Sequence, residues 1–113
     1  MKYHNKKVII DDIKFDSVKE SRRYQELKWL EKANEISELR LQVPFELQPS
    51  FKKDGKTYRK IEYIADFVYY DTKQDKYIVE DVKGSKTTRT EVYLLKKKIF
   101  EYKYPHLTIR EVY

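Results

Sequence analysis

Residues 63–84 decide the fold; they read YIADFVYYDTKQDKYIVEDVKG, two apolar runs separated by a short polar turn. The first run completes a strand predicted over residues 58–70, because its final half is apolar on both faces, as in a strand buried inside a sheet. The second run predicts a strand over residues 77–83. If the chain turns symmetrically about Lys73 and Gln74, the two strands form an antiparallel hairpin with a defined register.

One aspartate interrupts the first of these apolar runs. Aspartate is depleted in strands, and a buried carboxylate is costly unless it is paired with a cation or bound to a metal. The symmetric turn places Asp66 directly opposite Asp81, and the two-residue period of a strand adds Lys83 to the same face. Facing carboxylates repel one another unless a cation lies between them. The structural alternatives are a buried ion pair or a turn for Asp66, and a salt bridge from Lys83 that partly neutralises both acids.

The segment before this hairpin predicts a smaller hairpin and a helix. Residues 7–15 predict two short strands that turn at residues 11–12. Ser17 is expected to cap a helix that runs to about Ala33, with Asn34 as its C-cap. The inner face of this helix is predicted to carry Tyr24, Leu27 and Leu30.

The remaining elements follow from alternation and helical spacing. Residues 39–47 alternate between apolar and polar side chains, which predicts a strand, and Pro44 indicates an edge or a bulge. Residues 54–55, Asp-Gly, predict a tight turn. A helix is expected over residues 89–103 and a last strand over residues 107–112. The side chains predicted to face inward are Leu39, Leu41, Val43, Phe45 and Leu47 in the strand, and Val92, Leu95, Ile99 and Tyr102 in the helix.

Together these elements predict an α/β fold. Their order is a helix, three strands, a helix and a strand, preceded by the short N-terminal hairpin. A mixed sheet flanked by helices satisfies this order. A chain of 113 residues has room for one hydrophobic core, so we expect a single domain over residues 1–113.

The amino-acid composition limits the classes of partner and cofactor that we expect for this protein. Lysine and arginine number 25 against 19 aspartates and glutamates, which gives a net charge of +6 and a sequence pI of about 9.3. Such a surface suits DNA, although it also serves solubility alone. The chain has no cysteine, and its two histidines, His4 and His106, lie far apart in sequence, so a thiol or histidine-rich zinc site is not expected. No apolar run approaches the roughly 20 residues of a membrane span and no signal peptide is visible, which predicts a cytoplasmic protein without a membrane partner.

A third acid joins the two aspartates. Helical spacing places Glu20 on the same stripe as Tyr24 and Leu27, so its side chain extends the inner face of the helix toward the sheet. The capping box that starts at Ser17 explains this glutamate equally well, and Glu26 is a weaker alternative on the solvated side. Carboxylates without cysteine or clustered histidine favour Mg2+, for which Mn2+ can substitute. Such a site beside a lysine fits phosphodiester hydrolysis.

These residues resemble a known nuclease signature. Asp66, a short hairpin and Asp81-Val82-Lys83 resemble the PD-(D/E)XK signature, with Ala65 where its name has proline. Residues 15–20 and 24–27 look like the helix that brings a further catalytic glutamate in the resolvase and transposase-nuclease branches of that superfamily. The resemblance implies a restriction-endonuclease-like core.

Three further segments, residues 45–49, 63–67 and 79–84, are similar to a family of small phage-encoded proteins described as endonucleases or Holliday-junction resolvases. This resemblance covers nearly the whole chain. It implies a nuclease that acts in the cytoplasm of the host cell. The residues to which it assigns a catalytic role are Glu20, Asp66, Asp81 and Lys83, the first three as metal ligands.

Contacts with DNA are predicted for the second helix and the loop before it, where basic and aromatic side chains form a stripe beside Lys83. The stripe comprises Lys86, Thr90, Tyr93 and Lys97, and the residues predicted to bind DNA are Lys86, Arg89, Tyr93 and Lys97; a solvated lysine face is the alternative. The sequence therefore predicts a metal-dependent DNA endonuclease, and the resemblance implies one that is Holliday-junction-resolvase-like and selective for branched DNA. Symmetric resolution of a junction requires two active sites, which a homodimer would supply. The alternatives are a non-catalytic basic nucleic-acid-binding module on the same fold and an interaction domain with no nucleic-acid role.

Overall fold

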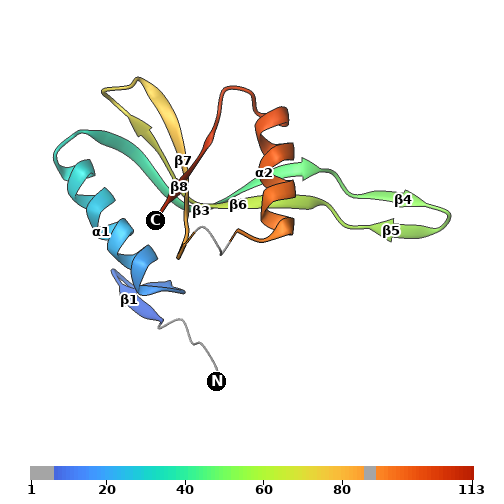
Figure 1. The fold of residues 1–113 in the computed structure, drawn as a ribbon, viewed down its shortest axis with the longest axis horizontal. Helices are drawn as coiled ribbons and strands as arrows, with labels where there is room; N and C mark the ends of the chain where they lie inside the picture. Colours follow the sequence, from blue (N-terminus) through green and yellow to red (C-terminus); the bar gives the residue numbers. More distant parts are fainter. Residues whose placement is uncertain (1–6, 86–88) are drawn as a thin grey trace.

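A mixed four-stranded β-sheet with a helix on each side forms the body of the protein (Figure 1). The computed structural model describes residues 7–85 and 89–113. Its elements are β1 (Val8–Ile10), β2 (Ile13–Phe15), α1 (Val18–Lys32), β3 (Ile36–Gln48), β4 (Phe51–Lys53), β5 (Lys56–Tyr58), β6 (Ile61–Asp71), β7 (Lys76–Val82), α2 (Glu91–Lys103) and β8 (Ile109–Val112). The strand order is β3-β6-β7-β8, with β8 parallel to β7 and the other neighbours antiparallel. The predicted α/β class, mixed sheet and N-terminal hairpin are confirmed.

The β6–β7 hairpin forms in the register that the sequence predicts. Phe67 pairs with Glu80, and the pairing continues in step to the turn. The Asp71 carboxylate closes this turn by accepting hydrogen bonds of 2.9 Å from the backbone N–H groups two and three residues later. The strand predicted over residues 58–70 is wrong in one respect, because the chain leaves strand geometry after β5 and only β6 joins the main sheet. Within the described residues, no helix is long and apolar enough to cross a membrane.

Two hydrophobic clusters pack on opposite faces of the sheet, one under each helix. Phe67 and Val68 are neighbours in β6, so their side chains point to opposite faces. Phe67 belongs to the cluster that contains Tyr24 and Leu27 of α1. Val68 belongs to the cluster that contains Phe100 of α2. This part of β6 is therefore buried on both faces, which explains its continuous apolar sequence.

The alternation of β3 is interrupted in its middle. The sequence predicts one inward face, but Leu41 packs against the cluster under α1 and Val43 against the cluster under α2. Gln42 lies between them with a φ of +50°, in the left-handed region that side chains rarely adopt. The two faces of the strand exchange at this residue, and the prediction of a single inward face is wrong. Pro44 lies in an edge strand, as expected.

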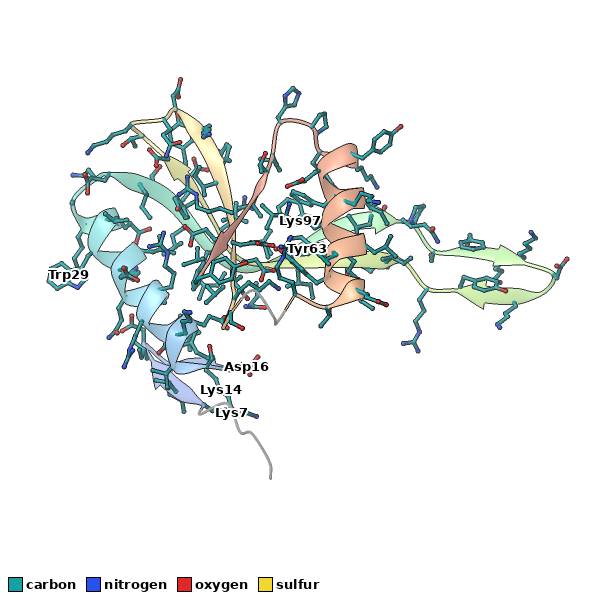
Figure 2. All side chains as sticks on the ribbon, viewed as in Figure 1. Lys7, Lys14, Asp16, Trp29, Tyr63 and Lys97 are labelled. Atoms are coloured by element: carbon teal, nitrogen blue, oxygen red, sulfur yellow. The ribbon has the colours of Figure 1, made fainter. Side chains whose placement is uncertain are left out.

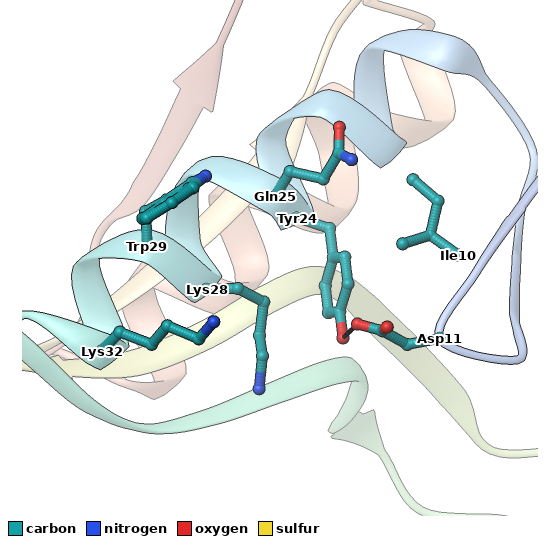
Figure 3. A pocket seen from close by; sticks show the side chains of 7 residues that line it. All are labelled: Ile10, Asp11, Tyr24, Gln25, Lys28, Trp29 and Lys32. Carbon is teal, nitrogen blue, oxygen red and sulfur yellow. Dashed lines mark hydrogen bonds between the residues drawn. The ribbon is translucent and has the colours of Figure 1, made fainter.

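The N-terminal hairpin is attached to α1 at its turn. Asp11 and Asp12 have φ values of +53° and +63°, the left-handed pair of a two-residue type I′ turn. The Tyr24 hydroxyl donates a 2.7 Å hydrogen bond to Asp11 Oδ2 across the pocket at this seam (Figure 3). Asp11 is the only acid among the residues that line this pocket in the described part of the chain, so the predicted cluster of carboxylates lies elsewhere.

α1 begins at the predicted cap. Ser17 is extended, and its Oγ accepts a 3.1 Å hydrogen bond from the backbone N–H of Glu20. Among the described residues only this half of the capping box forms, because the Glu20 carboxylate accepts from the Gln42 amide instead. The C-cap is Ala33 rather than the predicted Asn34, which lies one position further on with a left-handed φ of +59°.

α2 buries a different face from the predicted one. Three of the four stripe residues are exposed: Val92 to 63%, Leu95 to 58% and Tyr102 to 88%. The helix instead buries Tyr93 and Phe100, which lie about two turns apart. Both rings contact aromatic rings of the sheet, Tyr93 that of Tyr63 and Phe100 those of Phe45 and Tyr63.

Candidate active site

A hollow of about 490 Å³ opens where the N-terminal end of α1 meets the middle of β6 and the C-terminal end of β7. It is lined by Asp16, Ser17, Lys19, Glu20, Asp66, Asp81, Val82, Lys83 and Gly84. The four residues predicted to be catalytic therefore line one hollow, although they come from three separate segments of the chain. Figure 2 shows Asp16 near the foot of α1, at the start of the segment that forms one wall.

Beyond the last backbone pair of β6 and β7, the Asp66 side chain makes the next hydrogen bond between the two strands. The last paired residues on this side are Phe67 and Glu80. One step further on, Asp66 Oδ2 accepts a 2.7 Å hydrogen bond from the backbone N–H of Val82, and Oδ1 accepts one of 3.2 Å from the Gln42 amide. Burial raises the pKa of Asp66 above its usual range, and repulsion from Asp81 adds to the shift. The aspartate in an apolar run is thus explained by its place at the end of the ladder.

Asp81 is held by two partners on either side of its carboxylate. The Tyr63 hydroxyl donates a 2.7 Å hydrogen bond to Oδ2, and Lys83 Nζ lies 2.9 Å from Oδ1. Both side chains of this ion pair are only 11% exposed. The salt bridge offered as a structural alternative therefore exists, but it joins two residues of one segment and does not reach across to Asp66.

The aromatic ring of Tyr93 packs against the ammonium group of Lys83. Lys83 Nζ lies 3.3 Å from the centre of the Tyr93 ring, a cation–π contact that fixes the ammonium group at the edge of the hollow. The Tyr93 hydroxyl donates a 2.7 Å hydrogen bond to Glu111 on β8. Tyr93 is 8% exposed and its ring is covered by Lys83 and the core, so contact with DNA stays a prediction that would require Lys83 to move.

Glu20 faces the acids from the first turn of α1. Its Oε1 accepts a 3.0 Å hydrogen bond from the Gln42 amide, which also donates to Asp66 and so bridges the two carboxylates. Burial raises the pKa of Glu20 to about 7, with further contributions from repulsion by Asp66 and Asp16. The carboxylate is therefore half protonated near neutral pH, a state that a nearby cation would shift toward the charged form.

Sequence reasoning missed three residues that organise this site. Gln42 bridges Glu20 and Asp66, Tyr63 holds Asp81, and Tyr93 carries Lys83. The register of β3 on β6 places Gln42 between the pairs 41–67 and 43–65, and hence opposite Asp66. The sequence placed Gln42 on the solvent side of its strand, and no local pattern indicates the partner strand or the register.

Among the described residues, the side chains predicted to contact DNA do not form one exposed stripe. Arg89 Nε lies 3.1 Å from Glu111 Oε2, without the alignment of a hydrogen bond, and Lys97 pairs with Glu101 at 3.2 Å. Figure 2 shows Lys97 between α2 and the sheet. Lys86 lies outside the described residues. For Arg89 and Lys97, contact with DNA stays a prediction that would require these ion pairs to open.

The donor chemistry of the hollow fits a hard cation. Among the described residues, no three carboxylate or imidazole groups stand together as a formed metal-binding cluster. Lys83 and the Gln42 amide currently occupy oxygens that face the hollow. Glu20, Asp66 and Asp81 supply oxygens of the type that Mg2+ and Mn2+ prefer, and a cation would relieve the repulsion that helps to raise two of their pKa values. These three residues could hold the ion once the amide or the ammonium group gives way.

Comparison with known proteins adds a family. No curated protein and no solved structure matches the chain. A family model does match, over residues 1–112, and its description is "Protein of unknown function (DUF1064)". The match covers nearly every residue, including the four that are predicted to be catalytic: Glu20, Asp66, Asp81 and Lys83. The chain therefore belongs to the DUF1064 family.

Proposed function

We propose that the protein is a Mg2+-dependent DNA endonuclease whose active site is this hollow. The observation that carries the proposal is the meeting of Glu20, Asp66, Asp81 and Lys83 in one hollow of a basic protein. The same arrangement is what the resemblance to PD-(D/E)XK nucleases implies: an acid in one strand of a hairpin, an acid and a lysine in the next, and a glutamate from the preceding helix.

Each residue has a separate task in this proposal. Glu20, Asp66 and Asp81 bind the metal, which when bound supplies positive charge to the phosphoryl group and lowers the pKa of a water molecule. Lys83 stabilises the negative charge that builds on the phosphate and orients the attacking water. Its ammonium group is suited to this task because the Tyr93 ring holds it at the edge of the hollow. Tyr63 and Gln42 position the carboxylates.

The preference for branched DNA within the proposed function rests on the resemblance to the small phage-encoded proteins. Selectivity for branched DNA and a homodimer with two active sites belong to this proposal because the similar phage proteins are described as Holliday-junction resolvases. The net charge of +6 supports a nucleic-acid partner of any shape.

Cleavage by the purified protein tests the proposal directly. A labelled four-way junction, a matched duplex and a single strand are incubated with Mg2+, with Mn2+ or with a chelator. We expect products on at least one DNA with either metal and none with the chelator. Salt-sensitive binding without products at any metal concentration would support the non-catalytic module instead. Absence of binding at low salt would exclude both nucleic-acid functions.

Metal binding is expected to strengthen as the pH rises through 7. The pKa of Glu20 is about 7, and a ligand must lose its proton before it binds the ion. The apparent affinity for Mn2+ should therefore be about tenfold weaker at pH 6 than at pH 8, as follows from the fraction of charged carboxylate. Titration calorimetry at the two pH values measures the difference. Glu20→Gln should bind more weakly at both and lose most of the pH dependence; an equal affinity of the unaltered protein at pH 6 and pH 8 would argue against Glu20 as a ligand.

A further inference from the structure

The β4–β5 hairpin leaves the body of the protein. The two strands form a sheet of their own, and Figure 1 shows them projecting beyond the end of the main sheet, away from α1. Every residue from 48 to 61 is exposed; we call this segment the arm. An isolated two-stranded hairpin is at best marginally stable in water, so the arm contributes little to the stability of the fold. Its exposed strands are therefore available to a partner outside the chain.

The arm concentrates the charge of the protein. It contains five basic residues and one acid, a net charge of +4 out of +6 for the whole chain. The basic residues are Lys52, Lys53, Lys56, Arg59 and Lys60. Within the described residues, only Lys60 among them has an ion-pair partner, Glu62 at 3.4 Å. The positive charge of the arm is therefore largely uncompensated, which favours a polyanionic partner.

Strand pairing places two lysines against each other at the tip. Lys53 and Lys56 pair directly across the hairpin, beside the turn at residues 54–55. Like charges at directly opposed positions repel and destabilise a hairpin, and an anion between them would relieve the repulsion. On the same face, the rings of Phe51 and Tyr58 stack with centres 4.8 Å apart and planes only 9° from parallel. The aromatic pair holds the base of the arm in shape while the lysines occupy its tip.

We infer that the arm docks into the major groove of duplex DNA, with Lys53 and Lys56 on backbone phosphates. The inference depends on the proposed function for the choice of DNA among polyanions. Paired strands lie about 4.8 Å apart, and a major groove about 12 Å wide admits a two-stranded ribbon. Between Gly55 and Asp66 the chain spans at most about 36 Å at about 3.3 Å per residue, close to one turn of B-DNA. The arm and the hollow can therefore engage one duplex about one turn apart.

Removal of two charges from the tip tests the inference. The variant is Lys53→Gln/Lys56→Gln, and its matched control is Lys32→Gln/Lys76→Gln. The control removes the same charge from the last residue of α1 and the first residue of β7. These two element ends lie on the side of the molecule opposite the arm (Figure 1). Binding to a labelled 30-base-pair duplex is followed by fluorescence anisotropy in chelator, so that no DNA is cut. We expect the arm variant to raise the Kd by at least about tenfold at low salt and to reduce the slope of log K against log salt by about two, as expected for two lost phosphate contacts.

The outcomes separate the arm from the active site. The control should keep its Kd within about twofold and its slope unchanged, as expected if these lysines make no phosphate contact; equal weakening in both variants would overturn the inference in favour of a general charge effect. An unchanged Kd in the arm variant of a protein that cuts DNA would overturn it while the proposed function stands. Arm-dependent DNA binding without cleavage would leave the arm assignment in place and remove the nuclease. Binding only to an acidic protein or to anionic vesicles, and not to DNA, would overturn both.

Discussion

Asp66→Asn is expected to lower the rate of metal-dependent DNA cleavage by at least about 1,000-fold. In the proposed function the Asp66 carboxylate binds the metal, and an amide supplies no charge to hold the ion. The same substitution should change the unfolding temperature of the metal-free protein little, because the amide loses one of the two oxygens that accept from Val82 and Gln42 but also removes a buried charge. Burial raises the pKa of Asp66, which means that its charged form is less favourable in the folded chain than in the unfolded chain. This penalty is present at pH values above the folded pKa and is lost as the pH falls below it, so the neutral amide removes it at pH 7.

Asp16→Asn is the matched control. Asp16 lines the same hollow and carries the same charge, but it lies outside the proposed set of metal ligands. Its replacement should leave most of the cleavage rate in place. Single-turnover cleavage with Mn2+ and thermal unfolding followed by circular dichroism measure the two properties on each variant. Cleavage that survives in Asp66→Asn, or that is lost equally in both variants, would contradict the assigned role. Loss of cleavage together with a lower unfolding temperature would indicate a damaged fold.

The hairpin that carries Asp66 and Asp81 could be predicted from sequence because the information is local. Two apolar runs flank one short turn, and a symmetric turn fixes the register of every pair that follows. The positions of these acids and of Lys83 follow from that register alone. The cap at Ser17 is equally local, since the serine and the N–H that it accepts from are three residues apart. The two strands of this hairpin and the start of α1 form three sides of the hollow.

The residues that hold the acids in place could not be predicted, because they depend on contacts between distant segments. Gln42 reaches Asp66 only through the register of β3 on β6, and that register includes irregular steps. The left-handed backbone at Gln42 also exchanges the faces of β3, which a simple alternation of apolar and polar residues cannot reveal. In α2 two stripes competed, and the one with Tyr93 and Phe100 was buried, where its rings contact those of Tyr63 and Phe45 on the sheet. Lys83 consequently rests on a ring that the sequence had assigned to DNA.

Arg23→Met is expected to destabilise the protein by about 3–5 kcal/mol, because it leaves a buried charge without its partner. Arg23 Nε and one terminal nitrogen donate to the two carboxylate oxygens of Glu80 at 2.8 and 2.6 Å. The Glu80 side chain is fully buried, and its remaining hydrogen bond comes from the Tyr69 hydroxyl. Such a loss is a large part of the stability of a small domain and should lower the unfolding temperature by on the order of 10–20 °C. Urea denaturation and calorimetry measure both quantities.

The double variant Arg23→Met/Glu80→Gln decides whether the buried charge is the cause. It should recover most of the lost stability, because no charge remains buried and the Gln oxygen can still accept from Tyr69. A single variant that loses less than about 1 kcal/mol, or a double variant no more stable than the single, would contradict this account. The ion pair also bears on the site: Arg23 is one helical turn beyond Glu20, and Glu80 precedes Asp81 in β7. The pair therefore holds the helix that carries one acid against the strand that carries another, and the single variant should bind Mn2+ more weakly even where it remains folded.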